Sequence, residues 1–222
     1  MAKRAAGRPP RASFAKHLVI MAKSPLLGRV KRRLSHEIGD VVATRFYRSC
    51  LSHSVLRLAS DPRWRTVLTI TPDRDIAERF WPARPRIVLL PQGRGDLGQR
   101  MQRIFMGLPP GPAIIVGSDI PSLRPANVAE AFSRLGGADA VLGPARDGGY
   151  WLIGLKRTRG LPSPFAGVRW SSSHALADTL ANLRGRRIAF APTLSDVDTE
   201  KDFRRERSCA ERLIPPTKKP HQ

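Results

Sequence analysis

The sequence is poor in cysteine, in aromatic residues and in long apolar runs, and each shortage argues against a class of protein. Its 222 residues include only two cysteines, Cys50 and Cys209, without CxxC spacing and without a histidine at a recognisable motif spacing. This argues against a disulfide framework or a zinc site. No apolar run approaches transmembrane length, and the run at residues 18–22 is too short for a secretory signal. We therefore expect a cytoplasmic protein without a membrane span.

Acidic residues are also scarce: 18 Asp and Glu stand against 39 Lys and Arg, a formal net charge of +21. Such an excess is typical of proteins that bind nucleic acid, anionic membranes or phosphorylated ligands. However, no stretch interleaves basic and aromatic residues in the manner of a nucleic-acid platform. Because the charge is spread along the chain and densest at its ends, we interpret it mainly as solvated surface, with a local share around an anionic ligand.

Strand-like and helix-like segments alternate along the chain, which predicts an α/β fold with a mostly parallel central sheet and helices on both faces. Expected strands cover residues 17–21, 66–70, 86–90, 113–116, 138–142, 150–155 and 187–190. Expected helices cover residues 42–58, 73–81, 97–108, 128–135 and 176–183, with a last one from Thr199. We expect one domain over residues 16–214, between disordered basic tails at 1–15 and 215–222.

The stretch AIIVGSDIPSL, residues 113–123, is the first indication of a metal-binding site. Its β-branched run is typical of a strand buried on both faces, and it ends just before Asp119. Open α/β sheets bind ligands beyond the carboxyl ends of their strands, where a carboxylate suits Mg²⁺ or Mn²⁺. Asp119 as a mere cap of the next helix, which Pro125 can open, is the alternative.

A second carboxylate is sought in SDVDTEKD, residues 195–202. Asp196 and Asp198 are open candidates for a metal ligand. Asp202 fits better as the capping partner of Thr199, three residues earlier. Acidic residues at a helix start are common for dipole reasons alone, so a purely structural role stays open for all of them.

Residues 22–34, AKSPLLGRVKRRL, follow the first expected strand and match neither a P-loop nor GxGxxG. An ordinary exposed basic loop is one interpretation. Its place at a strand end favours the other, a site for a diphosphate. The cations that would contact the diphosphate are Lys23, Arg29, Lys31, Arg32 and Arg33.

Two glycine-containing stretches are also placed at strand ends. In DGGYW, Asp147 is a candidate base or a simple turn residue, and the two glycines permit close approach of a ligand. Tyr150 and Trp151 should point to opposite faces of their strand, so we expect at most one of them to line a pocket. In GDLGQRM, residues 95–101, Asp96 can cap the helix that follows, and backbone amides at the start of that helix could contact a base or ribose.

Six stretches in order carry a family resemblance: AKSPLLGRVKRRL, GDLGQRM, IIVGSDIPSL, ARDGGYWLIGL, FAGVRWSSSHAL and SDVDTEKDF. Together they resemble the bacterial GT-A-like transferases sometimes labelled arsenosugar-biosynthesis glycosyltransferases or radical-SAM/selenodomain-associated transferases. These proteins belong to the nucleotide-diphospho-sugar transferase superfamily. The resemblance implies a single Rossmann-like GT-A domain that binds a nucleotide or nucleotide-sugar with a divalent metal.

The resemblance also implies roles for individual residues. The phosphate-binding loop would include Lys23, Gly28, Lys31 and Arg33. The residues near the nucleoside would be Asp96, Leu97 and Gly98. The metal, Mg²⁺ or Mn²⁺, would be bound by Asp119 and Asp198. The sugar or acceptor would face Asp147, Gly148, Gly149 and Tyr150. Catalysis would rest on Asp147 as base and on Lys23 and Lys31 at the departing diphosphate.

Two departures from the family pattern concern this site. Arg32 stands where family members often have the threonine of KTRL, and SDIP replaces the DxD of many GT-A glycosyltransferases. The basic loop also resembles that of 2-phospho-lactate guanylyltransferases.

We therefore expect a transferase with a nucleotide or nucleotide-sugar and a small-molecule acceptor as partners. The favoured hypothesis is transfer of a sugar from a nucleotide-diphosphate sugar with a divalent metal. The alternative is nucleotidyl transfer with release of pyrophosphate. A third hypothesis, prompted by the charge alone, is a basic nucleic-acid-binding protein on a degenerate transferase scaffold. We rank it last and expect no specific nucleic-acid partner, because the ordered motifs converge on strand ends.

Overall fold

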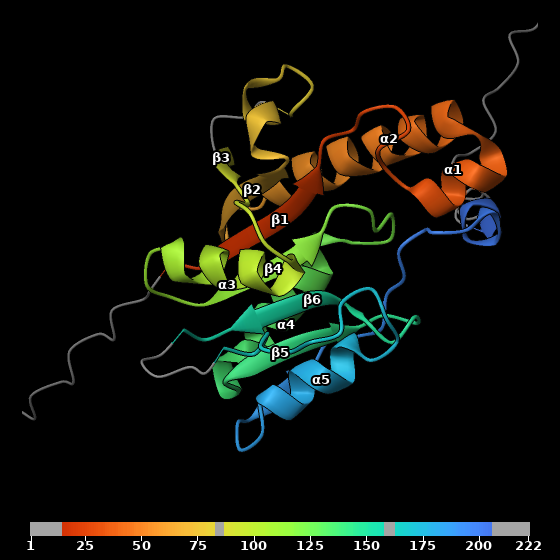
Figure 1. Ribbon diagram of the computed structural model, residues 1–222. Coiled ribbons are helices and arrows are strands. Elements are labelled where there is room, and N and C mark those ends of the chain that lie inside the picture. The colour runs from red at the N-terminus through yellow and green to blue at the C-terminus, as the bar shows by residue number, and fades with distance from the viewer. Residues whose placement is uncertain (1–14, 83–86, 158–162, 206–222) are drawn as a thin grey trace, which may run out of the picture.

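The computed structural model describes residues 15–82, 87–157 and 163–205, and a seven-stranded sheet runs through it (Figure 1). The strand order across the sheet is β3-β2-β1-β4-β6-β5-β7. The strands are β1 (His17–Lys23), β2 (Arg65–Thr71), β3 (Ile87–Pro91), β4 (Ala113–Gly117), β5 (Ala140–Pro144), β6 (Tyr150–Leu155) and β7 (Ile188–Phe190). Neighbours pair in parallel, except that β6 is antiparallel to both β4 and β5. The prediction of a mostly parallel α/β sheet is confirmed.

Helices cover both faces of the sheet. They are α1 (Arg32–Ile38), α2 (Asp40–Ala59), α3 (Leu97–Gly107), α4 (Pro125–Gly137) and α5 (Ala175–Asn182). One apolar core forms where α2 and α4 pack on the sheet, and it takes up Ile114 of β4. A second core forms against α3 and α5 on the other face, and it takes up Ile115. Because successive residues of β4 enter opposite cores, the strand is apolar throughout, as the sequence predicted.

Local sequence signals explain three of the helix starts. Asp96 caps α3: its carboxylate accepts from the backbone N–H of Gln99, and the Gln99 side chain accepts from the backbone N–H of Asp96. Pro125 is the first residue of α4. Residues 200–205 are helical, and Asp202 accepts hydrogen bonds from the backbone N–H and hydroxyl of Thr199. These capping predictions are confirmed.

Three local predictions need correction. The helix expected over residues 73–81 is only the short 3₁₀ helix η1 (Asp73–Ala77). Helix α1 was not expected, because the basic run that forms it has no clear apolar periodicity. The cap of α4 is Arg124, whose backbone N–H donates to the side chain of Asn127, so Asp119 does not cap that helix.

Several expectations fall on residues outside the described ranges. These are most of the predicted tails, the last residues of the expected domain and Cys209. Cys50 is buried in α2. Within the described ranges, no helix combines the length and the apolar character that a membrane span requires.

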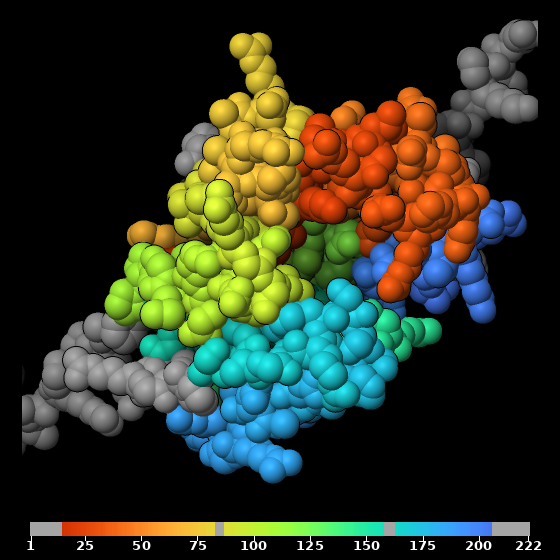
Figure 2. All heavy atoms as spheres, viewed as in Figure 1, coloured from red at the N-terminus to blue at the C-terminus, as the bar shows by residue number. Residues whose placement is uncertain are grey.

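The strand order creates a crevice at one edge of the sheet. The chain leaves β1 and enters β2 on one side, whereas β4 pairs with β1 on the other side. At such a reversal of strand order, the loops after the two strands diverge and leave room for a ligand. In the space-filling view, the same edge is hollowed, with green atoms visible at the bottom (Figure 2). The site is therefore sought where β1 and β4 end.

Replacement of Ile114 tests the role of β4 in the core. Its side chain is fully buried, so we expect Ile114→Ala to lower the free energy of unfolding by about 2–5 kcal/mol. Met106→Ala is the control, because Met106 is 75% exposed and its loss should change stability by less than ~0.5 kcal/mol. Urea unfolding followed by circular dichroism measures both. Equal effects would show that β4 is not a central strand.

Candidate active site at the carboxyl ends of β1 and β4

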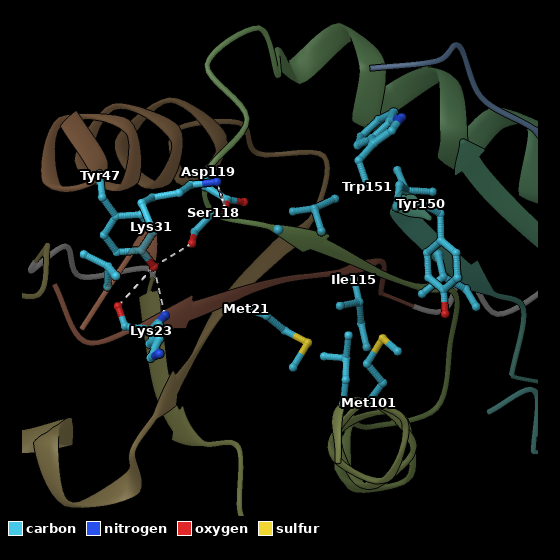
Figure 3. A pocket seen from close by; sticks show the side chains of 16 residues that line it. Met21, Lys23, Lys31, Tyr47, Met101, Ile115, Ser118, Asp119, Tyr150 and Trp151 are labelled. Carbon is cyan, nitrogen blue, oxygen red and sulfur yellow. Dashed lines mark hydrogen bonds and ion pairs between the residues drawn. The ribbon is translucent and has the colours of Figure 1, made fainter. Parts of the chain in front are cut away.

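One tyrosine ties the ends of the two strands together. The hydroxyl of Tyr47, on α2, accepts a hydrogen bond from the backbone N–H of Lys23 at 2.9 Å. The same hydroxyl lies 3.0 Å from the carbonyl oxygen of Lys23 and 3.0 Å from Oγ of Ser118 (Figure 3). Burial raises the pKa of Tyr47 to about 12, so it remains a neutral phenol. The last residue of β1 is thereby fixed beside the residue that precedes Asp119.

Three carboxylates converge next to this tie. One oxygen from each of Asp119, Asp196 and Asp198 lies within 4.8 Å of the other two. Asp119 follows β4, whereas Asp196 and Asp198 come from the segment between β7 and the last helix. From the sequence, the family resemblance implies Asp198 as a metal ligand, and the role of Asp196 is left open. The structure brings both to Asp119.

The ammonium of Lys31 lies among these carboxylates. Its Nζ atom is 2.6 Å from Oδ2 of Asp119 and 2.8 Å from Oδ1 of Asp198. It is 3.8 Å from Oδ2 of Asp196. The Lys31 side chain is 4% exposed, whereas the carboxylates are about one-third exposed. Three carboxylates therefore share one buried cation at the floor of an accessible site.

Burial and the charges of neighbouring groups together explain the pKa shifts of Lys31 and Asp196. Burial alone would lower the pKa of Lys31, but the carboxylates of Asp119 and Asp198 outweigh it and hold that pKa above its ordinary value. Burial raises the pKa of Asp196 to about 6, against the opposing effect of Lys31 and with help from Asp198 and Asp119. Because Lys31 lies 3.8 Å from Asp196 and within 2.8 Å of Asp119 and Asp198, it neutralises Asp196 least well of the three.

Two connected hollows open at this edge. The first chamber has a volume of about 300 Å³ and is lined by Lys23, Lys31 and Tyr47 at one end. Figure 3 shows Met21, Ile115 and Met101 side by side at its apolar part, next to α3. The second chamber, of about 440 Å³, is lined by polar and aromatic residues that include Asp147, Trp170, Ser172, Asp196 and Asp198. Asp119 and Leu97 line both chambers, so the two form one cleft.

Most of the predicted site residues lie in this cleft. The first chamber contains Lys23 and Lys31, and the second contains Arg33, Asp147, Gly149 and Asp198. Tyr150 and Trp151 point to opposite sides of β6 (Figure 3), yet both residues line both chambers. The expectation that at most one of them would line a pocket is therefore wrong. Trp151 also packs in the core and donates its indole N–H to the carbonyl oxygen of Pro192.

Four other predicted residues are not among those that line the cleft. Asp96 and Gly98 line a separate hollow along α3 together with Arg103 and Phe165. Gly28 has φ +68°, which favours glycine, and a Cβ there would come 3.3 Å from the carboxylate of Asp40. Gly148 has φ +83°, and its Cβ would collide with the backbone of Ser173. Gly28 and Gly148 are thus explained by local backbone geometry.

Tyr47, Ser118 and Trp170 also line the cleft, although the sequence did not point to them as site residues. Tyr47 lies on the buried face of α2, where its ring looks like any core residue. Its signal is chemical: a buried tyrosine hydroxyl needs a hydrogen-bond partner, and this one reaches the ends of two strands. Trp170 reaches the cleft from an irregular segment, where no periodicity points to a direction.

Comparison with known proteins agrees with this geometry. The family described as uncharacterised protein conserved in bacteria (DUF2064) matches residues 54–172. No curated protein sequence matches the chain significantly. A solved structure from Desulfovibrio desulfuricans G20, provisionally named a nucleotide-diphospho-sugar transferase, is similar with a TM-score of 0.78 and 29% identity. The match covers 92% of this chain and 90% of that one.

Two more distant structures share the fold. One is 4-diphosphocytidyl-2C-methyl-D-erythritol synthase from Anaerococcus prevotii DSM 20548, with a TM-score of 0.56 and 11% identity over 89% of this chain and 98% of that one. The other is Rv0371C of Mycobacterium tuberculosis H37Rv in complex with manganese, with a TM-score of 0.50 and 18% identity over 87% of this chain and 97% of that one. The fold resemblance predicted from the ordered motifs is confirmed.

Removal of the Tyr47 hydroxyl tests the tie between β1 and β4. We expect Tyr47→Phe to lower the free energy of unfolding by about 1–3 kcal/mol, because it leaves the half-buried backbone N–H of Lys23 and the buried hydroxyl of Ser118 without this partner. Tyr150→Phe is the matched control, since its hydroxyl has only a 3.4 Å contact with Thr179 among the described residues. Chemical denaturation of both variants measures the difference. Indistinguishable stabilities would contradict a special role for Tyr47.

Proposed function

Since the chain belongs to the DUF2064 family of uncharacterised bacterial proteins, we propose from its site that it is a metal-dependent transferase whose donor is a nucleotide-diphosphate sugar. The observation that carries the proposal is the convergence of Asp119, Asp196 and Asp198 beside Lys31 at the switch point of the sheet. The structural similarity to the Desulfovibrio protein supports a nucleotide-sugar donor.

The carboxylate cluster fits a hard divalent cation. Mg²⁺ and Mn²⁺ prefer oxygen ligands, and the cluster offers one carboxylate oxygen from each of three residues within 4.8 Å. The ammonium of Lys31 among these oxygens shows that a positive charge is stable there. Manganese in the Rv0371C structure, which shares the fold, supports the same assignment. Asp119, Asp198 and Asp196 would hold the cation, which would supply positive charge to the phosphates of the donor.

The chain's own cations would bind the diphosphate. Lys23 lies where β1 ends and lines the first chamber, and Arg33 lines the second. Between them, Lys31 lies against Asp119. As the bond between the diphosphate and the sugar breaks, negative charge grows on the leaving oxygen, and cations held in place stabilise it. Each well-placed group of this kind lowers the activation free energy by roughly 3–4 kcal/mol.

The first chamber suits the nucleoside and the second suits the sugar and acceptor. The apolar part of the first chamber, formed by Met21, Met101 and Ile115, matches the flat apolar face of a base. The second chamber combines the rings of Tyr150 and Trp170 with nearby carboxylates, a combination that suits a hydroxyl-rich ligand with an apolar face.

Asp147 is the residue we assign as general base. It lines the second chamber together with Asp119, where it could take a proton from an acceptor hydroxyl. Its Oδ1 atom also accepts a hydrogen bond from the backbone N–H of Gly149, which fixes the turn. An asparagine can accept the same hydrogen bond, so the substitution separates the two roles.

Replacement of Asp147 tests that assignment. We expect Asp147→Asn to slow release of nucleoside diphosphate from a stabilising nucleotide-sugar by about 10²–10⁴-fold, while the melting temperature and donor affinity stay unchanged. A coupled assay for nucleoside diphosphate measures the rate, and calorimetry measures the affinity. Unchanged turnover would leave Asp147 with its turn role alone.

Nucleotidyl transfer is the second candidate, because Asp198 reaches Asp119. The family resemblance implies a second metal ligand near this position in related nucleotidyltransferases, and the synthase from Anaerococcus prevotii shares the fold. In that reaction, the same cations would stabilise an in-line displacement at the α-phosphate of a nucleoside triphosphate. Released pyrophosphate, instead of nucleoside diphosphate, would identify it.

A thermal-shift experiment with Mg²⁺ or Mn²⁺ tests ligand binding at the site. A nucleotide-sugar at a hundred times its dissociation constant should raise the melting temperature by roughly 5–10 °C. We expect Asp119→Asn to abolish the part of this shift that depends on the metal. Glu130→Gln is the control, since it removes the same charge from an exposed ion pair with Arg134 on α4.

The outcomes separate the candidates. Stabilisation by UDP-, GDP- or dTDP-sugars supports sugar transfer and names the donor. Stabilisation by triphosphates alone favours nucleotidyl transfer. A metal-dependent shift that persists in Asp119→Asn would refute the site proposed here.

A further inference from the structure

The position of Lys31 conflicts with a simple role in phosphate binding. Its Nζ atom lies within 2.8 Å of oxygens from both Asp119 and Asp198. These carboxylates are the groups that would also hold a divalent cation. In the structure, therefore, the ammonium makes the contacts that a metal would make.

The backbone at Lys31 holds the ammonium in this place. Lys31 has φ +49° and ψ +47°, a left-handed conformation that costs a residue with a side chain roughly 1–2 kcal/mol. It immediately precedes α1, whose first turn begins at the next residue. A strained conformation persists where the surroundings impose it, and it is often found at functional sites. At Lys31 this conformation occurs together with the ion pairs to Asp119 and Asp198.

A divalent cation and the ammonium cannot share these contacts. Mg²⁺ binds carboxylate oxygens at about 2.0–2.1 Å. The Lys31 ammonium already lies 2.6 Å from Oδ2 of Asp119 and 2.8 Å from Oδ1 of Asp198, so an ion bound to the same two oxygens would lie close to it. Two positive charges would then lie side by side at a site where Lys31 is buried but the carboxylates are about one-third exposed, so water screens their repulsion only in part. The two cations therefore compete for the cluster.

The cluster favours exchange of the cation over permanent occupancy by the lysine. Three carboxylates against one ammonium leave two negative charges uncompensated when all three are ionised. Arg33 comes only within 3.8 Å of Asp198 and is 74% exposed, so water screens its contribution. A dication would neutralise the cluster better than Lys31 does, provided that the ammonium finds another partner.

We infer that Lys31 is a resident counter-ion, which closes the carboxylate cluster to divalent cations until the phosphates of a nucleotide draw its ammonium away. The inference rests on the proposed function, since it takes a nucleotide with phosphates as the ligand. Metal and nucleotide then bind with positive coupling: each raises the affinity for the other by the same factor. A free metal ion alone binds weakly, because it must displace Lys31 without offering it a new partner.

The test measures Mn²⁺ affinity of the full chain without nucleotide, by electron paramagnetic resonance or calorimetry. We expect Lys31→Gln to bind Mn²⁺ at least about tenfold more tightly than the natural chain, within the usual range of coupling. Lys31→Arg keeps the positive charge and should bind as weakly as the natural chain. Lys23→Gln is the matched control: it removes a lysine from the same chamber that makes no ion pair with any described carboxylate, so its effect should stay within about twofold.

Two further measurements guard against a folding defect. Without metal, Lys31→Gln should melt at a lower temperature, because its carboxylates repel one another, and Mn²⁺ should raise that temperature more than in the natural chain. Addition of UDP, GDP, CDP or dTDP should tighten Mn²⁺ binding by a larger factor in the natural chain than in Lys31→Gln. Chelation by the nucleotide affects both proteins equally and cancels in this comparison.

The results that overturn the inference differ from those that overturn the proposed function. If Lys31→Gln binds Mn²⁺ as weakly as the natural chain, or more weakly, Lys31 does not compete with the cation and the inference is wrong, while the metal-dependent transferase stands. If neither protein binds Mn²⁺, with or without nucleotide, the inference and the metal-dependent function fail together. Tighter binding in Lys31→Gln that Asp119→Asn abolishes supports both.

Discussion

The parallel pairing of β1 with β4 is the constraint on which the site depends. The register sets His17 opposite Ala113 and Met21 opposite Gly117, so the two strands end next to each other. Everything placed after either strand is then brought to the same edge: the basic loop from β1 and Asp119 from β4. The hydroxyl of Tyr47 fixes this alignment at its functional end, because it contacts the last residue of β1 and Ser118.

Charge at this edge is arranged in two layers. The chain as a whole carries a formal net charge of +21, yet the floor of the cleft is a group of carboxylates. Lys23 and Arg33 of the basic loop line the same cleft, and Lys31 of that loop lies among the carboxylates. Such an arrangement favours a ligand that brings both signs, as a diphosphate with a divalent cation does. In the proposed function, the positive surface would attract the phosphates and the carboxylates would hold the cation.

Local rules predicted most of the fold and part of the site. Some features depend only on neighbours in sequence and could therefore be predicted. They are the buried strand β4, the cap at Asp96 and the proline at the start of α4. Helix α1 and the short η1 were not predicted, since packing against the sheet and neighbouring helices decides their extent. The ordered motifs pointed to the right fold family, because they mark strand ends that this fold always brings together.

The sequence by itself determined which chemical groups stand at the ends of the strands: a basic loop after β1, Asp119 after β4 and paired aspartates before the last helix. Only the tertiary structure decided which of them meet. Asp196 and Asp198 are far from Asp119 along the chain and reach it through the path after β7, which no local pattern specifies. The direction of the Lys31 side chain could not be predicted either, because its partners Asp119 and Asp198 are distant in sequence. Periodicity reports which residues are buried; the pairing of charges across the fold is settled by packing.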